Sequence, residues 1–229
     1  LQTRLNETNQ YAEIHQLKIN EEKTKIMSFN NTFKYDFLPK YFIGGKQLEV
    51  VNSTKLLGIH ITSNMKWNLH TQKTVAKAKK KLWYLRRLSQ LKASVTTLLD
   101  IYHKVIRSVM EQGAPIYTGG LTKTNIDEFE SVQKSAFRII LRGRYYDYNS
   151  ALNTLEQLTL EERRKNISLK FAKKSVSHPK MKHLFKKQLK TRTRGGEKNQ
   201  DKFIEPRYKT DRANNGPVNY LIRLLNSKC

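Results

Sequence analysis

The main change in the spacing of hydrophobic positions along this chain falls between residues 61 and 68. Between residue 17 and this point, apolar residues stand in short runs of strand length. From Asn68 onward they recur every three or four residues, as on one face of an α-helix. The order predicts an α+β protein in which a small antiparallel sheet precedes a mostly α-helical bundle. A basic tail without apolar periodicity follows Lys190, and we expect it to be partly disordered.

The sheet is predicted from three segments of the N-terminal part. Residues 23–29 and residues 55–61 are two of these strand-like runs. Between them, apolar runs flank Gly44 and Gly45, and a Gly-Gly pair supplies the positive φ angles of a two-residue hairpin turn. Together these segments predict three or four strands of an antiparallel sheet.

The two ends of the chain carry weaker patterns. Residues 1–17 have helical spacing, and we expect this helix to pack through Leu5, Tyr11 and Ile14. The C-terminal segment has one apolar patch that could dock onto the rest of the chain as a strand or as a helix turn. The patch consists of Tyr220, Leu221, Ile222, Leu224 and Leu225.

The first three helices predicted in the helical region are long. The first begins at Asn68, the second is capped by Ser94, and the third begins with Thr124 and Asp127 in a capping-box arrangement and ends at Gly143. The apolar stripe of the first is Thr71, Val75, Ala78, Leu82, Leu85 and Leu88. The core face of the second is Val95, Leu98, Leu99, Tyr102, Val105, Ile106 and Val109. The core face of the third is Phe129, Val132, Ala136, Phe137 and Ile140.

A fourth helix begins at a capping box formed by Thr159 and Glu162, and His178-Pro179 ends it. Its expected core residues are Leu160, Ile167, Phe171 and Ala172. Met181, Leu184 and Phe185 predict one more short helix.

Charge is distributed unevenly along the chain. The formal net charge is +25, and no Asp or Glu stands between Glu49 and Asp100, where ten Lys or Arg occur. A second acid-free segment, residues 163–196, holds thirteen more. A solvated helix face normally mixes both signs, so two such segments indicate a polyanionic partner. Nucleic acid is the first candidate, and an anionic membrane surface is the second.

Aromatic residues interleave with these charges. Trp67, Trp83, Tyr84, Tyr145, Tyr146 and Tyr148 could stack on nucleobases. Packing in the core is the competing interpretation. A helix that carries Trp83 and Tyr84 side by side is expected to bury at least one of them.

Catalytic-metal chemistry finds little support in the sequence. The six Asp residues stand singly, whereas nucleotidyl transfer needs clustered carboxylates to hold Mg²⁺. The His residues show no metal-ligand spacing, and we expect no metal or cofactor in this chain. The one cysteine, Cys229, excludes a disulfide framework, and no apolar run is long enough to span a membrane. A reducing intracellular location, in the nucleus or cytoplasm, fits these features.

Several short motifs stand in a fixed order along the chain. They are Leu-Lys-Ile-Asn at residues 17–20, Lys-Thr-Lys at 23–25, Ile-Gly-Gly at 43–45, Lys-Leu-Leu-Gly-Ile at 55–59, Trp67 with His70, Gly-Ala-Pro-Ile-Tyr at 113–117, and residues 158–164. In this order they resemble the reverse transcriptases of non-LTR (LINE-like) retrotransposons. The first two are similar to the element after the active-site strand of those enzymes, the next two to the hairpin and strand that come next, and the last three to the continuation into the thumb and beyond.

The resemblance implies a division of the chain. Residues 1–61 would be the end of the palm, residues 62–143 the helical thumb, residues 144–190 a basic helical extension, and residues 191–229 a flexible linker and tail. The chain departs from the family in one decisive respect. The paired-Asp strand is expected just before Leu1, so the catalytic Asp pair, its Mg²⁺ and the fingers are not in this chain.

The resemblance also implies roles for individual residues. Lys23 would occupy the mobile lysine position, where it could donate a proton to the leaving pyrophosphate. Leu57, Gly58 and Ile59 would lie at the primer grip. A solvated lysine and an ordinary edge-strand glycine are the competing interpretations. The candidate contacts to template and primer are Lys73, Lys77, Lys80, Lys81, Arg86, Arg87, Arg142, Arg144, Arg163, Arg164, Lys173 and Lys174.

Three functions follow from these observations. The chain is expected to be the C-terminal part of an RNA-directed DNA polymerase that binds an RNA or DNA template–primer without catalysing synthesis. A stand-alone nucleic-acid-binding protein, domesticated from such an element, is the alternative. A structural interaction module is the third, and it predicts binding that is insensitive to salt.

Overall fold

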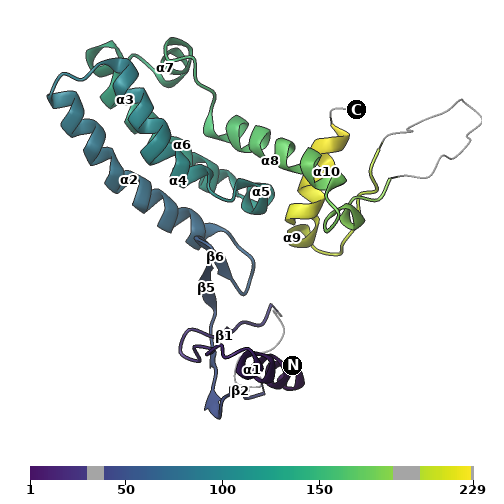
Figure 1. Ribbon diagram of the computed structural model, residues 1–229. Coiled ribbons are helices and arrows are strands. Elements are labelled where there is room, and N and C mark those ends of the chain that lie inside the picture. The colour runs from purple at the N-terminus through teal and green to yellow at the C-terminus, as the bar shows by residue number, and fades with distance from the viewer. Residues whose placement is uncertain (30–38, 188–201, 228–229) are drawn as a thin grey trace, which may run out of the picture. The chain divides into compact units, whose positions relative to one another are not determined.

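The structure of the chain, a computed structural model, describes residues 1–29, 39–187 and 202–227 (Figure 1). The chain forms two compact units, Leu1–Leu69 and His70–Cys229. The first unit contains short strands, and the second is helical. The predicted α+β class, a small sheet followed by a helical bundle, is confirmed. The division into palm, thumb and extension stays a prediction.

The described residues of the first unit form the helix α1 and three separate pairs of strands. One pair joins β1 to β4 in parallel, and the pairs β2–β3 and β5–β6 are antiparallel. The described strands are only two to four residues long, so the expected single sheet of three or four strands is replaced by these short ladders. The elements are α1 (Gln2–Ile14), β1 (Lys25–Ile26), β2 (Phe42–Ile43), β3 (Lys46–Gln47), β4 (Glu49–Val50), β5 (Ser53–Leu56) and β6 (Ile59–Thr62).

The helix α1 is held by polar contacts instead of by the expected apolar face. Tyr11 and Ile14 are exposed, Leu5 is half-buried, and Ala12 is the buried residue of this helix. The side-chain amide of Gln2 donates to the Phe42 carbonyl (2.8 Å) and accepts from the Phe42 N–H (3.0 Å), so it extends the edge of β2 like a backbone unit. The apolar residues of α1 are too widely spaced around the helix to form a continuous stripe.

Two tight turns shape the first unit. Gly44 and Gly45 both have positive φ angles between β2 and β3, which confirms the predicted hairpin. Leu57 and Gly58 have positive φ angles of 47° and 89° and join β5 to β6. Residues 55–61 are therefore a hairpin, and the prediction of one continuous strand there was wrong. A non-glycine residue at positive φ is unusual, and nothing in the run of apolar residues marks Leu57 for it.

Helices make up most of the second unit. In Figure 1, α2, the segment from α3 to α4, and α6 run beside one another, and α10 lies against α8. The helices are α2 (Asn68–Gln90), α3 (Val95–Ile101), α4 (Ser108–Glu111), α5 (Ala114–Tyr117), α6 (Lys123–Leu141), α7 (Tyr148–Thr154), α8 (Leu160–Ser177), α9 (Asp211–Asn214) and α10 (Pro217–Asn226). The π-helix η2 (Tyr102–Arg107) joins α3 to α4, and the 3₁₀ turns are η3 (Thr118–Gly120), η4 (Arg142–Arg144) and η5 (Lys182–Leu184).

The second predicted helix runs through η2 without a break in its buried face. Leu98, Tyr102, Ile106 and Met110 are all fully buried, and each follows the last by four residues. Ser94 caps this helix through a bond from the Thr97 N–H (3.1 Å), as predicted. The π-helical turns carry the buried face from α3 into α4.

The predicted core of α6 is confirmed, but its cap lies two residues earlier than expected. Thr122 and Asn125, in place of Thr124 and Asp127, form the capping box. The side-chain oxygen of Asn125 accepts the Thr122 N–H (3.2 Å) as a Glu carboxylate would, so this capping box forms without an acid at its last position. All five predicted core residues of α6, from Phe129 to Ile140, are fully buried.

The helix α8 begins and ends as predicted. Thr159 and Glu162 form the capping box, and the helix stops at Ser177, before His178-Pro179. Phe171, predicted to face the core, is 39% exposed, because the buried face of α8 runs instead through Leu160, Arg164, Ser168, Ala172 and Ser175.

The apolar patch near the C-terminus forms a helix, which decides between the two conformations left open. Leu221, Ile222, Leu224 and Leu225 of α10 are buried in one cluster with Leu169 and Ala172 of α8 and with Phe185 and Phe203. The predicted linker of residues 191–202 lies almost wholly outside the described residues.

A buried carboxylate links three helices of the second unit. Glu130 of α6 accepts hydrogen bonds from the backbone N–H groups of Leu160 (3.3 Å) and Glu161 (2.9 Å), at the start of α8. It also accepts from the Tyr148 hydroxyl of α7. Gln133, one turn further along α6, donates to Tyr148 (3.0 Å) and to the Leu158 carbonyl (2.9 Å). Burial and the hydrogen bond to Glu130 raise the pKa of Tyr148 above its usual value.

We expect Glu130→Ala to lower the free energy of unfolding by roughly 2–4 kcal/mol, because it leaves two backbone donors and a buried hydroxyl without their acceptor. Glu128→Ala, on the same helix, is the control and should change stability by less than about 0.5 kcal/mol. Urea unfolding followed by circular dichroism measures both. Equal effects of the two substitutions would contradict the role given to Glu130.

Candidate nucleic-acid interface

The exposed side of α2 is a strongly basic surface. The buried side of α2 consists of His70, Thr71, Thr74, Val75, Ala78, Leu82 and Leu85. Five of the six cations predicted on this helix, Lys73, Lys77, Lys80, Arg86 and Arg87, are exposed, and Lys81 is half-buried. With Lys79 they form what we call the α2 basic face. Because the helix repeats every 3.6 residues, burial of the predicted stripe of small and branched residues leaves these cations on the opposite, exposed side.

The α2 basic face has no protein counter-charge in the part of the chain that the structure describes. The ion pairs found there do not involve any Lys or Arg of α2. The helix itself contains no acid. Like charges three or four residues apart on a helix repel one another, and a bound polyanion would relieve this repulsion.

Trp83 and Tyr84 both lie on the exposed side of α2. Their side chains are 59% and 50% exposed, and their rings form an edge-to-face pair with centroids 5.3 Å apart. The expectation that at least one of them lies in the core was wrong. Leu82 and Leu85 occupy the core positions, and the two residues between them fall on the outer arc of the helix.

The exposed face of α8 is a second basic surface. Lys173 and Lys174 are exposed, as predicted for contacts to a polyanion, and so is Lys170. A groove of about 440 Å³ lies along this face. It is lined by Leu158, Arg163, Asn166, Ile167, Leu169, Lys170 and Lys173. The groove therefore combines an apolar floor with cations at its side.

Arg163 lies in this groove but is engaged within the protein. Its guanidinium donates to both carboxylate oxygens of Glu111, with 3.2 Å from Nη2 to Oε2, and Arg107 lies 3.6 Å from the same carboxylate. The hydrogen bonds to Glu111 raise the pKa of Arg163. Arg163 thus ties α8 to α4, and its capacity for phosphate is reduced.

Arg164 does not fit the predicted contact to nucleic acid, because it is fully buried. Its guanidinium lies over the ring of Phe129, 4.7 Å from the centroid. None of its three side-chain nitrogens has a hydrogen-bond acceptor among the described residues. The sequence places two arginines side by side at the start of a helix, and one of them turns inward.

Arg142 and Arg144 flank the turn after α6. Arg142 donates to the Ser89 hydroxyl (2.9 Å) and to the carbonyls of Ser89 (3.1 Å) and Ala93 (2.9 Å), so it satisfies the C-terminal end of α2. Arg144 is exposed. The structure thus gives Arg142 a role within the fold and leaves Arg144 at the surface.

The remaining predicted site residues belong to the first unit. Leu57, 88% exposed, and Gly58 form the tip of the β5–β6 hairpin, and Ile59 is buried. Lys23 is exposed on the turn before β1, where its backbone N–H donates to the Asn20 side chain (2.9 Å). The roles of Lys23 and of Leu57, Gly58 and Ile59 stay predictions.

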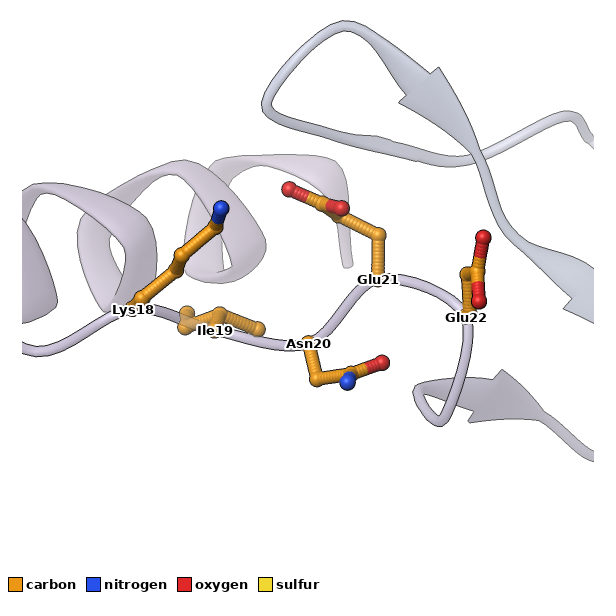
Figure 2. Close-up of a pocket in the computed structure, with 5 residues that line it drawn as sticks. All are labelled: Lys18, Ile19, Asn20, Glu21 and Glu22. Atoms are coloured by element: carbon orange, nitrogen blue, oxygen red, sulfur yellow. The ribbon is translucent and has the colours of Figure 1, made fainter.

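A small pocket that the sequence did not predict precedes Lys23. It has a volume of about 320 Å³ and is lined by residues 18–22. Figure 2 shows Lys18 and Glu21 pointing to one side of the connection and Asn20 to the other. Glu22 pairs with Lys46 at 3.1 Å. The pocket presents both signs of charge, and these contacts indicate no particular ligand.

The described residues contain no group of three or more His, Cys, Asp or Glu side chains placed to hold a metal ion. None of the helices in the described ranges is both long and apolar enough to cross a membrane.

Comparisons of the chain with protein-family models, with curated proteins and with solved structures found no match.

Arg164 gives a prediction for stability. Arg164→Met should leave the melting temperature unchanged or raise it, because an apolar side chain of similar length keeps the contact with Phe129 and removes a buried charge that lacks an acceptor. Arg164→Ala should lower the melting temperature by several degrees through the cavity it creates. Differential scanning calorimetry measures both. If Arg164→Met destabilises the protein as much as Arg164→Ala does, the guanidinium has an acceptor that stabilises it.

Proposed function

We propose that this chain binds nucleic acid through the α2 basic face, and that it is the C-terminal part of a non-LTR retrotransposon reverse transcriptase. The observation that carries the proposal is the row of exposed cations on α2, a helix that contains no acid and forms no ion pair with the other described residues. A row of this kind favours a partner that presents regularly repeated negative charge. The phosphate backbone of RNA or DNA is such a partner.

Lysine and arginine side chains that neutralise phosphates release the counterions condensed on the nucleic acid, and this release supplies affinity without regard to sequence. The exposed Lys170, Lys173 and Lys174 of α8 extend the same chemistry to a second helix. The expected mode of binding is therefore electrostatic and tolerant of sequence. A template–primer substrate fits this mode, since a polymerase must hold whatever sequence it copies.

The resemblance to reverse transcriptases adds the particular roles. In that assignment α2 belongs to the thumb, the hairpin tip at Leu57 and Gly58 approaches the primer, and Lys23 lies beside an active site completed by other residues. A backbone exposed at a tight turn can donate to a phosphate without side-chain interference at glycine. The domesticated nucleic-acid-binding protein remains the second assignment, and it shares the α2 basic face.

We expect Lys73→Glu/Lys77→Glu/Lys80→Glu to weaken binding to nucleic acid at least tenfold. It should reduce the slope of log affinity against log salt by about 3 for a duplex, one unit for each lost phosphate contact. The control Lys18→Glu/Lys40→Glu/Lys209→Glu changes the net charge equally, at three exposed lysines outside α2 and α8. Fluorescence anisotropy over a salt series measures both variants. Equal losses would show that overall charge matters and the α2 basic face does not.

The chain by itself should give no Mg²⁺-dependent primer extension, because its Asp residues stand singly and no group of three or more His, Cys, Asp or Glu among the described residues is placed to hold a metal ion. A primer-extension assay on an RNA template, with binding of the same template–primer verified in parallel, tests this. Robust synthesis would show that the chain holds a complete active site.

A further inference from the structure

The exposed aromatic pair Trp83–Tyr84 indicates a ligand that makes apolar contacts with this surface. Trp67, the other tryptophan of the chain, is buried, whereas Trp83 presents more than half of its surface to solvent. Two large aromatic side chains on one exposed helix face leave considerable apolar area in water, at about 25 cal/mol for each Å². Cations alone would suffice for a surface that binds only phosphates. The pair therefore indicates a partner with flat apolar groups.

Two cations bracket the pair along α2. Lys80 stands three residues before Trp83 and four before Tyr84, and Arg87 stands four and three residues after them. Residues at these spacings are neighbours on a helix surface. Both cations are exposed, and about 10 Å of helix axis separates them. The order cation, aromatic pair, cation thus lies along one stripe of the α2 basic face.

We propose that Trp83 and Tyr84 stack on unpaired nucleobases while Lys80 and Arg87 hold the adjoining phosphates, so that the α2 basic face binds single-stranded nucleic acid in preference to duplex. This inference rests on the proposed function and names the form of nucleic acid that it takes. Stacking of a base on an aromatic ring is tolerant of sequence, because every base offers a π-face.

A duplex offers these rings little. Its bases already stack on one another, and an inserted side chain must first separate them, which costs a few kcal/mol for each step. A single strand presents its bases without that cost. The duplex can use the cations of α2 but leaves the aromatic pair unused.

Two other partners fit the face less well. A protein helix packed on the pair would bury Lys80 and Arg87 unless it brought acids to both places. An anionic membrane is bound by helices with a broad apolar stripe, and the apolar stripe of α2 is buried inside the second unit. On the exposed side the two aromatic residues stand among six exposed cations.

The experiment compares a single-stranded oligonucleotide with a duplex of the same length, titrated into the full chain at about 50 mM salt. Binding of the single strand should quench the Trp83 emission, while the buried Trp67 gives a constant background. Trp83→Ala/Tyr84→Ala should weaken single-strand binding tenfold or more and duplex binding by less than about twofold. The salt slope should be unchanged, because the cations remain.

Two control variants accompany this experiment. Tyr11→Ala/Tyr208→Ala removes two other exposed rings and should leave both affinities unchanged. Trp83→Phe/Tyr84→Phe keeps the rings and should retain most of the single-strand affinity. Circular dichroism and the melting temperature verify that each variant is folded, as expected for exposed positions.

The outcomes separate this inference from the proposed function. Tight, salt-dependent binding of both forms, with no preference and no effect of Trp83→Ala/Tyr84→Ala, overturns the stacking proposal and leaves nucleic-acid binding intact. Binding of neither form at low salt overturns both. Binding to phosphatidylserine vesicles that exceeds single-strand binding and depends on Trp83 assigns the pair to a membrane and overturns the proposal.

Discussion

The fold of the helical unit depends on the carboxylate of Glu130, which accepts hydrogen bonds from two backbone N–H groups that carry partial positive charge. Glu130 is buried, yet it faces the free N–H groups at the start of α8, where the helix dipole is positive. Because it projects from α6, it determines where α8 begins relative to the core. The hydroxyl of Tyr148 joins the same carboxylate from α7. Three helices thereby share one acceptor, and the position of each constrains the other two.

The scarce acids of this chain are used in the same manner elsewhere. Glu111 holds Arg107 and Arg163, and Glu162 caps α8. These carboxylates neutralise charge inside the fold or at helix ends. None of the described acids forms an ion pair with the α2 basic face, so the cations of this face stay uncompensated among the described residues. The acids that neutralise cations inside the fold are not available to neutralise the cations of α2 at the surface.

Periodicity and capping chemistry predicted the helices well, because both are local. The buried faces of α2 and α6 and the ends of α8 follow from spacing within one helix. Three features could not be predicted, because they depend on more than spacing. Leu57 adopts a positive φ that nothing in the neighbouring apolar residues indicates. Arg164 of α8 turns inward over the ring of Phe129, which belongs to α6, and the exposure of Trp83 depends on which side of α2 packs against the core. The sequence alone could not separate the exposed cations of α2 from Arg142, Arg163 and Arg164, whose side chains contact the protein itself.

The π-helix between α3 and α4 has a consequence for how the chain tolerates changes of length. In an α-helix, residues four apart advance by about 40° around the axis, so three such steps would turn the buried face through about 120°. The wider turns of η2 compensate, and Leu98, Tyr102, Ile106 and Met110 stay in line. Such a segment behaves like a helix that has absorbed an inserted residue. A residue inserted at such a segment widens a turn of the helix instead of lengthening a loop, so the neighbouring connections keep their lengths.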